Sequence, residues 1–132
     1  RLLSRAGADL TGKTLPHGDL VVVELSIASE ARVENVVFSD LLPAGLEIEN
    51  PRLATSQQLP LPAGTDALST QRCELRDDRL LVFADLPGGK RVHRYLARAV
   101  TRGRFLLPAV SAHCMYDPDV ASTHRRGQVV IE

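Results

Sequence analysis

Short stretches rich in Val, Leu and Phe recur along the chain, and Gly, Pro and Asp separate them. Such runs are typical of β-strands bounded by turns, whereas the regular spacing of an amphipathic helix is hard to find here. The runs cover residues 20–28, 33–40, 46–48, 73–76, 79–86, 91–101, 103–108, 110–114 and 128–131. About eight strands at this spacing predict an all-β fold, a two-sheet antiparallel sandwich of the immunoglobulin or fibronectin-III type.

The first two long runs indicate which side chains face the core. In the first, four apolar residues alternate with a mixed set, as in a strand with one buried face. These four are Val21, Val23, Leu25 and Ile27. The second run, 33–40, is apolar on both faces, which predicts a central strand. Its two faces carry Val36 with Phe38, and Val33 with Val37.

The remaining organisation is that of one domain. The length of 132 residues fits a single domain, 1–132, and neither an internal repeat nor a break in composition divides it. Residues 1–11 are predicted to be a linker. Residues 51–71 hold three prolines and a glycine among Thr, Ser and Gln, which predicts a long connection with room for one short helix. Because the chain starts at Arg1 without a signal-peptide pattern, we expect a fragment of a longer protein.

The balance and placement of charged residues argue against nonspecific binding to nucleic acids or membranes. The chain has 16 basic and 16 acidic side chains, so it lacks the net field that drives nonspecific binding to nucleic acids or anionic membranes. A local group of basic residues, Arg91, Arg94, Arg98, Arg102 and Arg104, is better explained as a solvated face or as ion-pair partners of Asp77, Asp78 and Asp85. On one strand, Tyr95 would point away from these charges, which argues against base stacking.

Motifs of catalysis are missing as well. We find no Gly-rich phosphate loop, no Gly-x-Ser-x-Gly elbow and no His-Glu-x-x-His pair. His113 and Cys114 are adjacent, but neighbours on a strand point to opposite faces, so the imidazole could not readily activate the thiol. The histidines and cysteines lack paired metal-ligand spacing. We therefore predict a protein that is not an enzyme and holds no metal or cofactor, with a cysteine-dependent enzyme centred on Cys114 as a remote alternative.

The two cysteines, Cys73 and Cys114, leave two alternatives open. They could form a disulfide, which would close a loop and stabilise the fold by about 3–4 kcal/mol in the chain-entropy model. They could equally be two inert, buried thiols. The bridge requires an oxidising compartment.

The sequence Met115-Tyr116-Asp117-Pro118 follows a predicted strand and forms the best candidate for a contact site. Asp117 can accept backbone hydrogen bonds in an Asx turn, and Pro118 restricts the residue before it, so the corner should be rigid. Two consecutive side chains cannot both point into the core of an extended segment. We therefore expect at least one large apolar side chain to face outward, as docking elements often do.

Five segments of the chain form a recognisable series. In order, they read Leu-Pro-His-Gly-Asp-Leu-Val-Val-Val at 15–23, Ser-Asp-Leu-Leu-Pro-Ala-Gly-Leu-Glu-Ile-Glu-Asn at 39–50, Arg-Asp-Asp-Arg at 76–79, Tyr-Leu-Ala-Arg-Ala-Val-Thr-Arg-Gly at 95–103, and Met-Tyr-Asp-Pro at 115–118. Together these segments resemble the C-terminal macroglobulin-like (MG10) domain of bacterial alpha-2-macroglobulins. The resemblance runs from about residue 12 to the end of the chain.

The resemblance implies a macroglobulin-like sandwich within a large periplasmic protease trap, often tethered to the inner membrane as a lipoprotein. In such a trap a protease cuts a bait segment, and the ensuing rearrangement entangles the protease. Members with a thioester also bind it covalently, through a motif that starts with Cys and ends with Gln in a separate helical domain. Neither Cys73 nor Cys114 is followed by that Gln, so this domain would not carry the thioester.

The implied role is to pack against the helical thioester-type domain and keep water from the thioester until the bait is cut. Residue by residue, Met115 and Tyr116 would form this lid, and Asp117 and Pro118 would fix its direction. In members without a thioester the same corner would be an interdomain contact only. The alternative function is a spacer module of a bacterial surface adhesin, since Asp-x-Leu-Pro-Ala-Gly also occurs in such repeats.

Overall fold

The computed structural model describes residues 1–49, 67–68, 70–117, 121–124 and 127–132. The strands of this described part are β1 Leu2–Leu3, β2 Thr14–Leu15, β3 Leu20–Ser29, β4 Val33–Leu41, β5 Leu46–Ile48, β6 Thr70–Leu75, β7 Arg79–Leu86, β8 Gly89–Ala99, β9 Gly103–Leu107, β10 Ser111–Cys114, β11 Ala121–Thr123 and β12 Gly127–Ile131. No helix occurs among the described residues, so none of them forms an apolar helix that could cross a bilayer.

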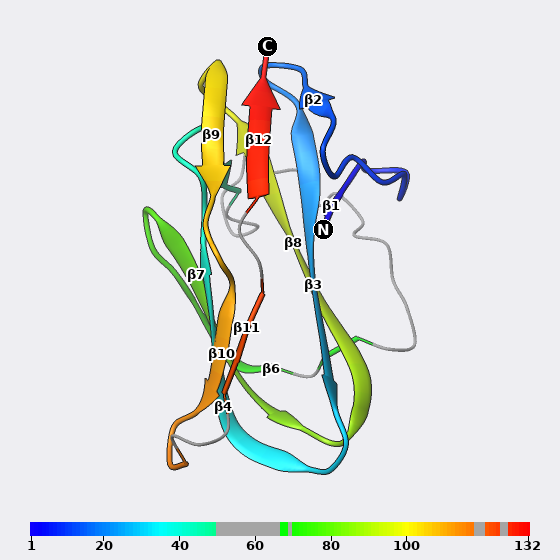
Figure 1. Cartoon of the computed structure of the whole chain (residues 1–132), viewed down its shortest axis with the longest axis vertical. Helices are drawn as coiled ribbons and strands as arrows, with labels where there is room; N and C mark the ends of the chain where they lie inside the picture. The colour runs from blue at the N-terminus through cyan, green and yellow to red at the C-terminus, as the bar shows by residue number, and fades with distance from the viewer. Residues whose placement is uncertain (50–66, 69, 118–120, 125–126) are drawn as a thin grey trace.

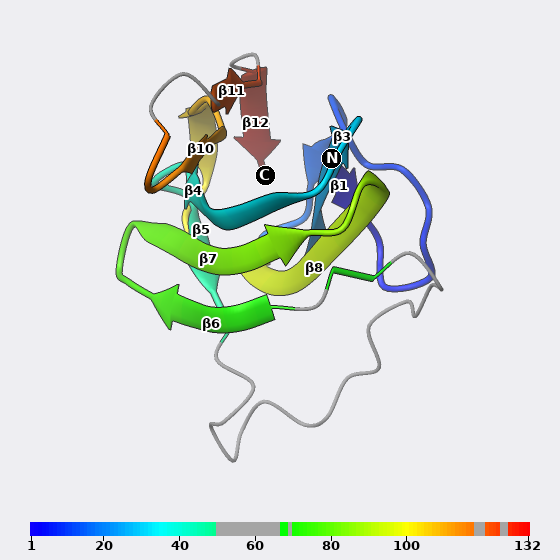
Figure 2. The same ribbon diagram turned by 90° about the horizontal axis from the view of Figure 1, so that it is seen from below.

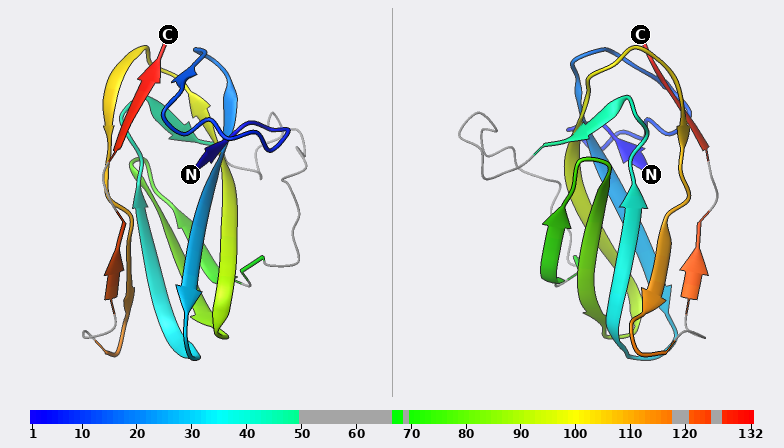
Figure 3. Two further views of the ribbon diagram at one scale, coloured as in Figure 1. Left: turned by 45° about the vertical axis from the view of Figure 1, so that its right-hand side comes forward. Right: turned by 90° about the vertical axis from the view of Figure 1, so that its left-hand side faces the viewer.

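The strands form two facing sheets and a smaller third one (Figure 1). One sheet has the order β1-β3-β8-β5, and the other has the order β11-β10-β4-β7-β6, whose strands lie side by side in the right-hand view of Figure 3. The third, β2-β12-β9, lies at the end of the molecule that holds the C terminus. Among the strands of the described residues, every pairing is antiparallel except that of β12 with β2. The predicted all-β sandwich is confirmed, with twelve strands in the described part instead of about eight.

The β3–β8 pair is the backbone of the first sheet. It runs without interruption from Leu20 opposite Arg98 to Ser29 opposite Gly89. As predicted, Val21 and Val23 face the core, where they meet side chains of the opposite sheet such as Phe38. The alternation that the sequence displays is therefore the alternation that the structure buries.

A β-bulge in β4 places Val33 on a different face from the predicted one, whereas Val36 and Phe38 share a core face as predicted. The register between β4 and β7 shifts between Val33 and Val36, and Asn35 adopts a positive φ of 57°. The extra residue turns Val33 to the same side as Val36, and Val33 packs against the core cluster. The prediction assumed that side chains alternate strictly between the two faces from residue 33 onward, and it failed because the bulge inserts one extra residue into the strand.

The segment that the sequence assigned to a linker is partly folded into the sandwich. Leu2 and Leu3 pair with β3 and are each only 4% exposed. Their short apolar run carries too little pattern to predict a strand. The prediction of a short helix within 51–71 falls largely on residues outside the described part of the chain.

Candidate functional site

The corner at residues 115–117 is held on its N-terminal side by the β4–β10 ladder. Cys114 lies opposite Val36, and the backbone N–H of Met115 donates to the carbonyl of Asn35 at 2.8 Å. The Cys114 thiol donates to the Glu34 carbonyl at 3.2 Å. The segment that follows β10 lies at the end of the molecule opposite the C terminus (Figure 1). The corner therefore projects from a paired strand.

Both large side chains of the corner face outward. Tyr116 is 80% exposed and Met115 is 43% exposed, while Asp117 is exposed as well. Pro118 lies outside the described residues, so its part in the predicted corner stays a prediction. Exposed large apolar side chains elsewhere in the described chain, Leu75 and Leu106, stand on β6 and β9. Met115 and Tyr116 are thus the one adjacent pair of this kind in the described residues.

The structure keeps the two cysteines apart. Both thiols are free, Cys73 is exposed on β6, and Cys114 is half-buried on β10. In the shared sheet, β7 and β4 lie between these strands, so three strand spacings of about 4.8 Å separate them. A disulfide needs Cα atoms within about 7 Å. The sheet order therefore favours the alternative of two free thiols, although neither is as deeply buried as that alternative expected.

The structure gives Cys114 no catalytic partner among the described residues. Its thiol is hydrogen-bonded to the Glu34 carbonyl, and the neighbouring His113 is exposed. No group of three or more His, Cys, Asp or Glu side chains in the described part of the chain could hold a metal ion.

The basic residues of β8 find partners that differ from the predicted ones. Arg94 pairs with Glu24 at 2.9 Å, and Arg98 pairs with Glu49 at 3.5 Å. Two of the three predicted aspartates bond elsewhere: Asp78 pairs with Arg79, and Asp85 accepts hydrogen bonds from Asn35 and Gln71. Strand order decided these contacts, since Arg94 lies directly opposite Glu24 in the β3–β8 ladder.

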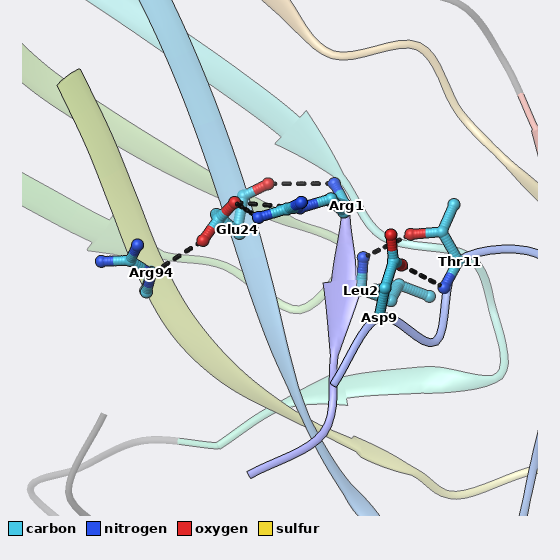
Figure 4. Close-up of polar contacts among 6 residues, drawn as sticks. All are labelled: Arg1, Leu2, Asp9, Thr11, Glu24 and Arg94. Atoms are coloured by element: carbon cyan, nitrogen blue, oxygen red, sulfur yellow. Dashed lines mark hydrogen bonds and ion pairs between the residues drawn. The ribbon is translucent and has the colours of Figure 1, made fainter. Parts of the chain in front are cut away.

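Glu24 is a buried charge that the sequence did not single out (Figure 4). Its side chain is only 4% exposed, and it lies between Arg94 and Arg1, whose Nη2 donates to Oε1 at 2.6 Å. Burial by itself raises the pKa of Glu24, but the hydrogen bonds from Arg1 and Arg94 outweigh it and hold the pKa below its ordinary value. This ion cluster ties β1, β3 and β8 together.

A second buried polar contact crosses the sandwich. The Tyr95 hydroxyl on β8 donates to Asp40 on β4, and both residues are buried. Burial raises the pKa of Asp40, and the hydrogen bond from Tyr95 opposes that rise. Tyr95 therefore faces the core, on the opposite side of β8 from Arg94, as predicted.

A cavity of about 860 Å³ opens between the two sheets. Its walls include Leu25 and Ile27 of β3, Phe38 of β4 and Ala112 of β10, together with Thr123 of β11. Leu25, Ile27 and Ala112 are only partly buried although they pack against the core. The sandwich is therefore incompletely closed along this side.

Comparison with known proteins places this geometry in one family. The sequence matches the family described as Bacterial Alpha-2-macroglobulin MG10 domain over residues 2–119. Alpha-2-macroglobulin of Xylella fastidiosa (strain Temecula1) is 34% identical in an alignment 128 residues long, which covers 90% of this chain and 8% of that protein. This chain thus spans about a twelfth of the length of that relative, as the 8% share implies.

Two solved structures of Escherichia coli alpha-2-macroglobulin share the fold. The native conformation gives a TM-score of 0.83 at 28% identity and covers 99% of this chain and 9% of the other. The form activated by porcine elastase gives a TM-score of 0.86 at 29% identity and covers 99% of this chain and 12% of the other. The same sandwich is thus similar to a part of that protein in both forms.

Proposed function

The chain belongs to the family of bacterial alpha-2-macroglobulin MG10 domains, and we propose that it is a non-catalytic interaction domain of a larger protease trap. In this proposal Met115 and Tyr116 form a lid that covers a neighbouring helical thioester-type domain until the bait is cut. The single observation that carries the lid is the outward orientation of two adjacent large apolar side chains on a strand-anchored corner.

The exposed side chains of Met115 and Tyr116 could bury their apolar surface only against another domain. Tyr116 is 80% exposed and Met115 is 43% exposed, and neither belongs to the hydrophobic core of its own domain. Against a second domain, the same side chains could bury apolar surface, and the tyrosine hydroxyl could bond to a polar rim. Met115 has the flexible, polarizable side chain that fills irregular gaps.

The chemistry of a thioester makes a cover valuable. Water and other nucleophiles destroy an acyl thioester, so its lifetime depends on how well its surroundings exclude them. A stiff corner suits this task because it costs little conformational entropy on docking. The ladder bond from Met115 to Asn35 supports such stiffness on the N-terminal side, and Asp117 and Pro118 would supply it on the other.

The sandwich moves as a rigid unit in this proposal. Its likeness to both the native and the elastase-activated form of the Escherichia coli protein supports a domain that changes neighbours without refolding. Withdrawal of the lid would then follow from domain movement after bait cleavage. We place the larger protein in the periplasm, as a lipoprotein of the inner membrane, with proteases as its targets.

The test is the double substitution Met115→Ala with Tyr116→Ala in the larger protein. We expect faster spontaneous loss of the thioester, read by amine incorporation, and faster protease-independent rearrangement, read by electrophoretic mobility. In a parent without a thioester, the mobility readout alone applies. Because both side chains are exposed, the unfolding midpoint of the domain should stay within the range of ordinary surface substitutions.

Leu106→Thr is the matched control. Leu106 is 69% exposed on β9, in the third sheet, so its replacement also removes an exposed apolar side chain but leaves the corner intact. Unchanged spontaneous inactivation in the double variant, or equal acceleration by Leu106→Thr, would show that the corner is not a lid.

A further inference from the structure

One edge of the first sheet is only partly paired. β1 is two residues long and covers β3 at Val22 and Val23, and Arg1 extends the ladder to Glu24. The Glu24 N–H donates to the Arg1 carbonyl at 2.8 Å, and the Arg1 nitrogen donates to the Glu24 carbonyl at 3.0 Å. Beyond Glu24, β3 continues to Ser29 with no described strand on the side away from β8.

Strand geometry shows which backbone groups this edge offers. Because Glu24 exchanges both of its bonds with Arg1, residues two and four positions further on must present their N–H and C=O groups to the same side. These residues are Ser26 and Ala28. The amides of Leu25 and Ile27 point to β8 instead, where the register places them opposite His93 and Arg91.

The open edge borders an apolar hollow. Leu25 and Ile27 turn their side chains toward the cavity between the sheets, and both remain partly exposed there. β11, the end strand of the opposite sheet, bounds the hollow from the other side through Ser122 and Thr123. In Figure 2 the N terminus lies beside β3, in line with this edge.

We propose that the β3 edge from Leu25 to Ser29 receives an extended strand of the larger alpha-2-macroglobulin polypeptide. This strand runs antiparallel to β3, in line with β1, and exchanges backbone bonds with Ser26 and Ala28. Its side chains opposite Leu25 and Ile27 share the inward face of Leu2, so they must be apolar, whereas those between them face outward and can be polar. The occupant thus completes the sheet and closes the hollow.

Two observations favour a strand from the same protein over other occupants. The ladder that β1 begins already sets the register and direction in which further chain would continue along β3. This chain also spans only 8% of the Xylella fastidiosa relative, so most of the polypeptide of such a protein lies outside the domain. Free edges with apolar neighbours invite pairing with other chains unless they are covered, which gives the contact a structural purpose.

Amide hydrogen exchange tests this proposal without reference to the lid. We compare the 132-residue chain with the larger protein and follow the amides of Ser26 and Ala28. We expect exchange to slow by about tenfold or more at these two positions in the larger protein. Leu25 and Ile27, which bond to β8 in both, are the internal reference and should change less.

A substitution identifies the backbone bond as the cause. Ser26→Pro removes the N–H that faces the open edge of β3 but breaks no bond to β8. In the larger protein it should abolish the extra protection of Ala28, while Ser26→Ala, which keeps the N–H, should preserve it. If Ser26→Pro prevents folding, the two unsubstituted proteins still decide the matter: slower exchange at Ser26 and Ala28 but not at Leu25 and Ile27 supports the added strand, and equal slowing at all four overturns it.

Three further results would overturn the proposal. The first is equal exchange at Ser26 and Ala28 in both proteins. The second is protection in the 132-residue chain that rises with its concentration, since the edge would then pair with a second copy. The third is slower exchange in the larger protein that Ser26→Pro leaves intact, because side-chain burial alone would explain it. None of these results bears on the rate of thioester loss.

Discussion

The hydroxyl of Tyr95 on β8 donates a hydrogen bond to the carboxyl of Asp40 on β4, and this bond joins the two sheets across the interior of the sandwich. Both residues are buried, so their hydrogen bond joins the two sheets inside the core. The proposed contact site, by contrast, lies on the exposed Met115 and Tyr116, outside the core.

Removal of the Tyr95 hydroxyl should destabilise the domain. Tyr95→Phe leaves the buried Asp40 carboxyl without its donor, and an unsatisfied buried group costs about 1–3 kcal/mol. We expect a loss of this size in the free energy of unfolding, measured with urea at neutral pH. Tyr116→Phe removes the same hydroxyl from an 80% exposed ring and should leave stability unchanged. Equal effects of the two substitutions would contradict the tie between the sheets.

Asp40 should make stability depend on pH in a defined direction. Burial raises the pKa of Asp40 above its ordinary value of 3.8, so the folded state holds this proton more tightly than the unfolded state. Its contribution to stability is full below 3.8 and is lost as the pH rises through the higher pKa of the folded state. The Asp40→Asn variant cannot titrate there, so its stability should increase relative to the unsubstituted chain over that window.

Urea unfolding at a series of pH values measures this difference. The Tyr95→Phe variant provides an internal comparison, because the hydrogen bond from Tyr95 lowers the pKa of Asp40. Without it the pKa should rise further, and the loss of stability should move to higher pH. A constant difference between Asp40→Asn and the unsubstituted chain at all pH values would refute the assignment.

The sequence predicted the strands well but their lateral contacts poorly. Alternation placed Val21 and Val23 in the core, and the turn residues bounded β7 correctly. The pairing of Arg94 with Glu24 depends on which strands are neighbours, and alternation carries no such information. The bulge at Asn35 left no pattern in the sequence, so the position of Val33 was wrong.

For the candidate site too, the sequence predicted local geometry but not contacts between strands. Local geometry predicted that two adjacent large side chains in a corner cannot both be buried. In the structure both of these side chains, Met115 and Tyr116, are exposed. The free edge of β3 could not be predicted, because it depends on the short β1, which the sequence assigned to a linker. Two-residue strands owe their existence to the sheet that they join rather than to their own propensity.

A side chain at Gly45 should destabilise the domain, because two residues approach this glycine closely. A Cβ at this position would lie 2.7 Å from Ile131 Cδ1 and 2.6 Å from Phe105 Cδ2. Since overpacking typically costs about 1–3 kcal/mol, Gly45→Ala should lower the free energy of unfolding by that amount. At Gly127 a Cβ would lie no closer than 3.6 Å to Leu107, so Gly127→Ala is the matched control. A Gly45→Ala variant as stable as Gly127→Ala would show that the third sheet can shift to make room.

Glu24 should stabilise the domain through its charge, with a pH dependence opposite to that of Asp40. Its pKa is lowered, so the contribution to stability is full above the ordinary value of 4.5 and is lost as the pH falls through the lower pKa of the folded state. Glu24→Gln keeps the shape but weakens the bonds to Arg1 and Arg94. Because Arg1 is 54% exposed, water screens part of the interaction, and we expect a loss of roughly 1–2 kcal/mol at neutral pH.

The matched control for Glu24→Gln is Glu34→Gln, which removes an exposed ion pair with Arg32 at 3.1 Å. Exposed pairs contribute about 0–1 kcal/mol, so this variant should lose less. Unfolding at acidic pH gives the second check, since the deficit of Glu24→Gln should shrink as Glu24 of the unsubstituted chain becomes protonated. A deficit that persists unchanged into strong acid would mean that the amide disturbs packing between β1, β3 and β8, and that the carboxylate charge is not what joins these strands.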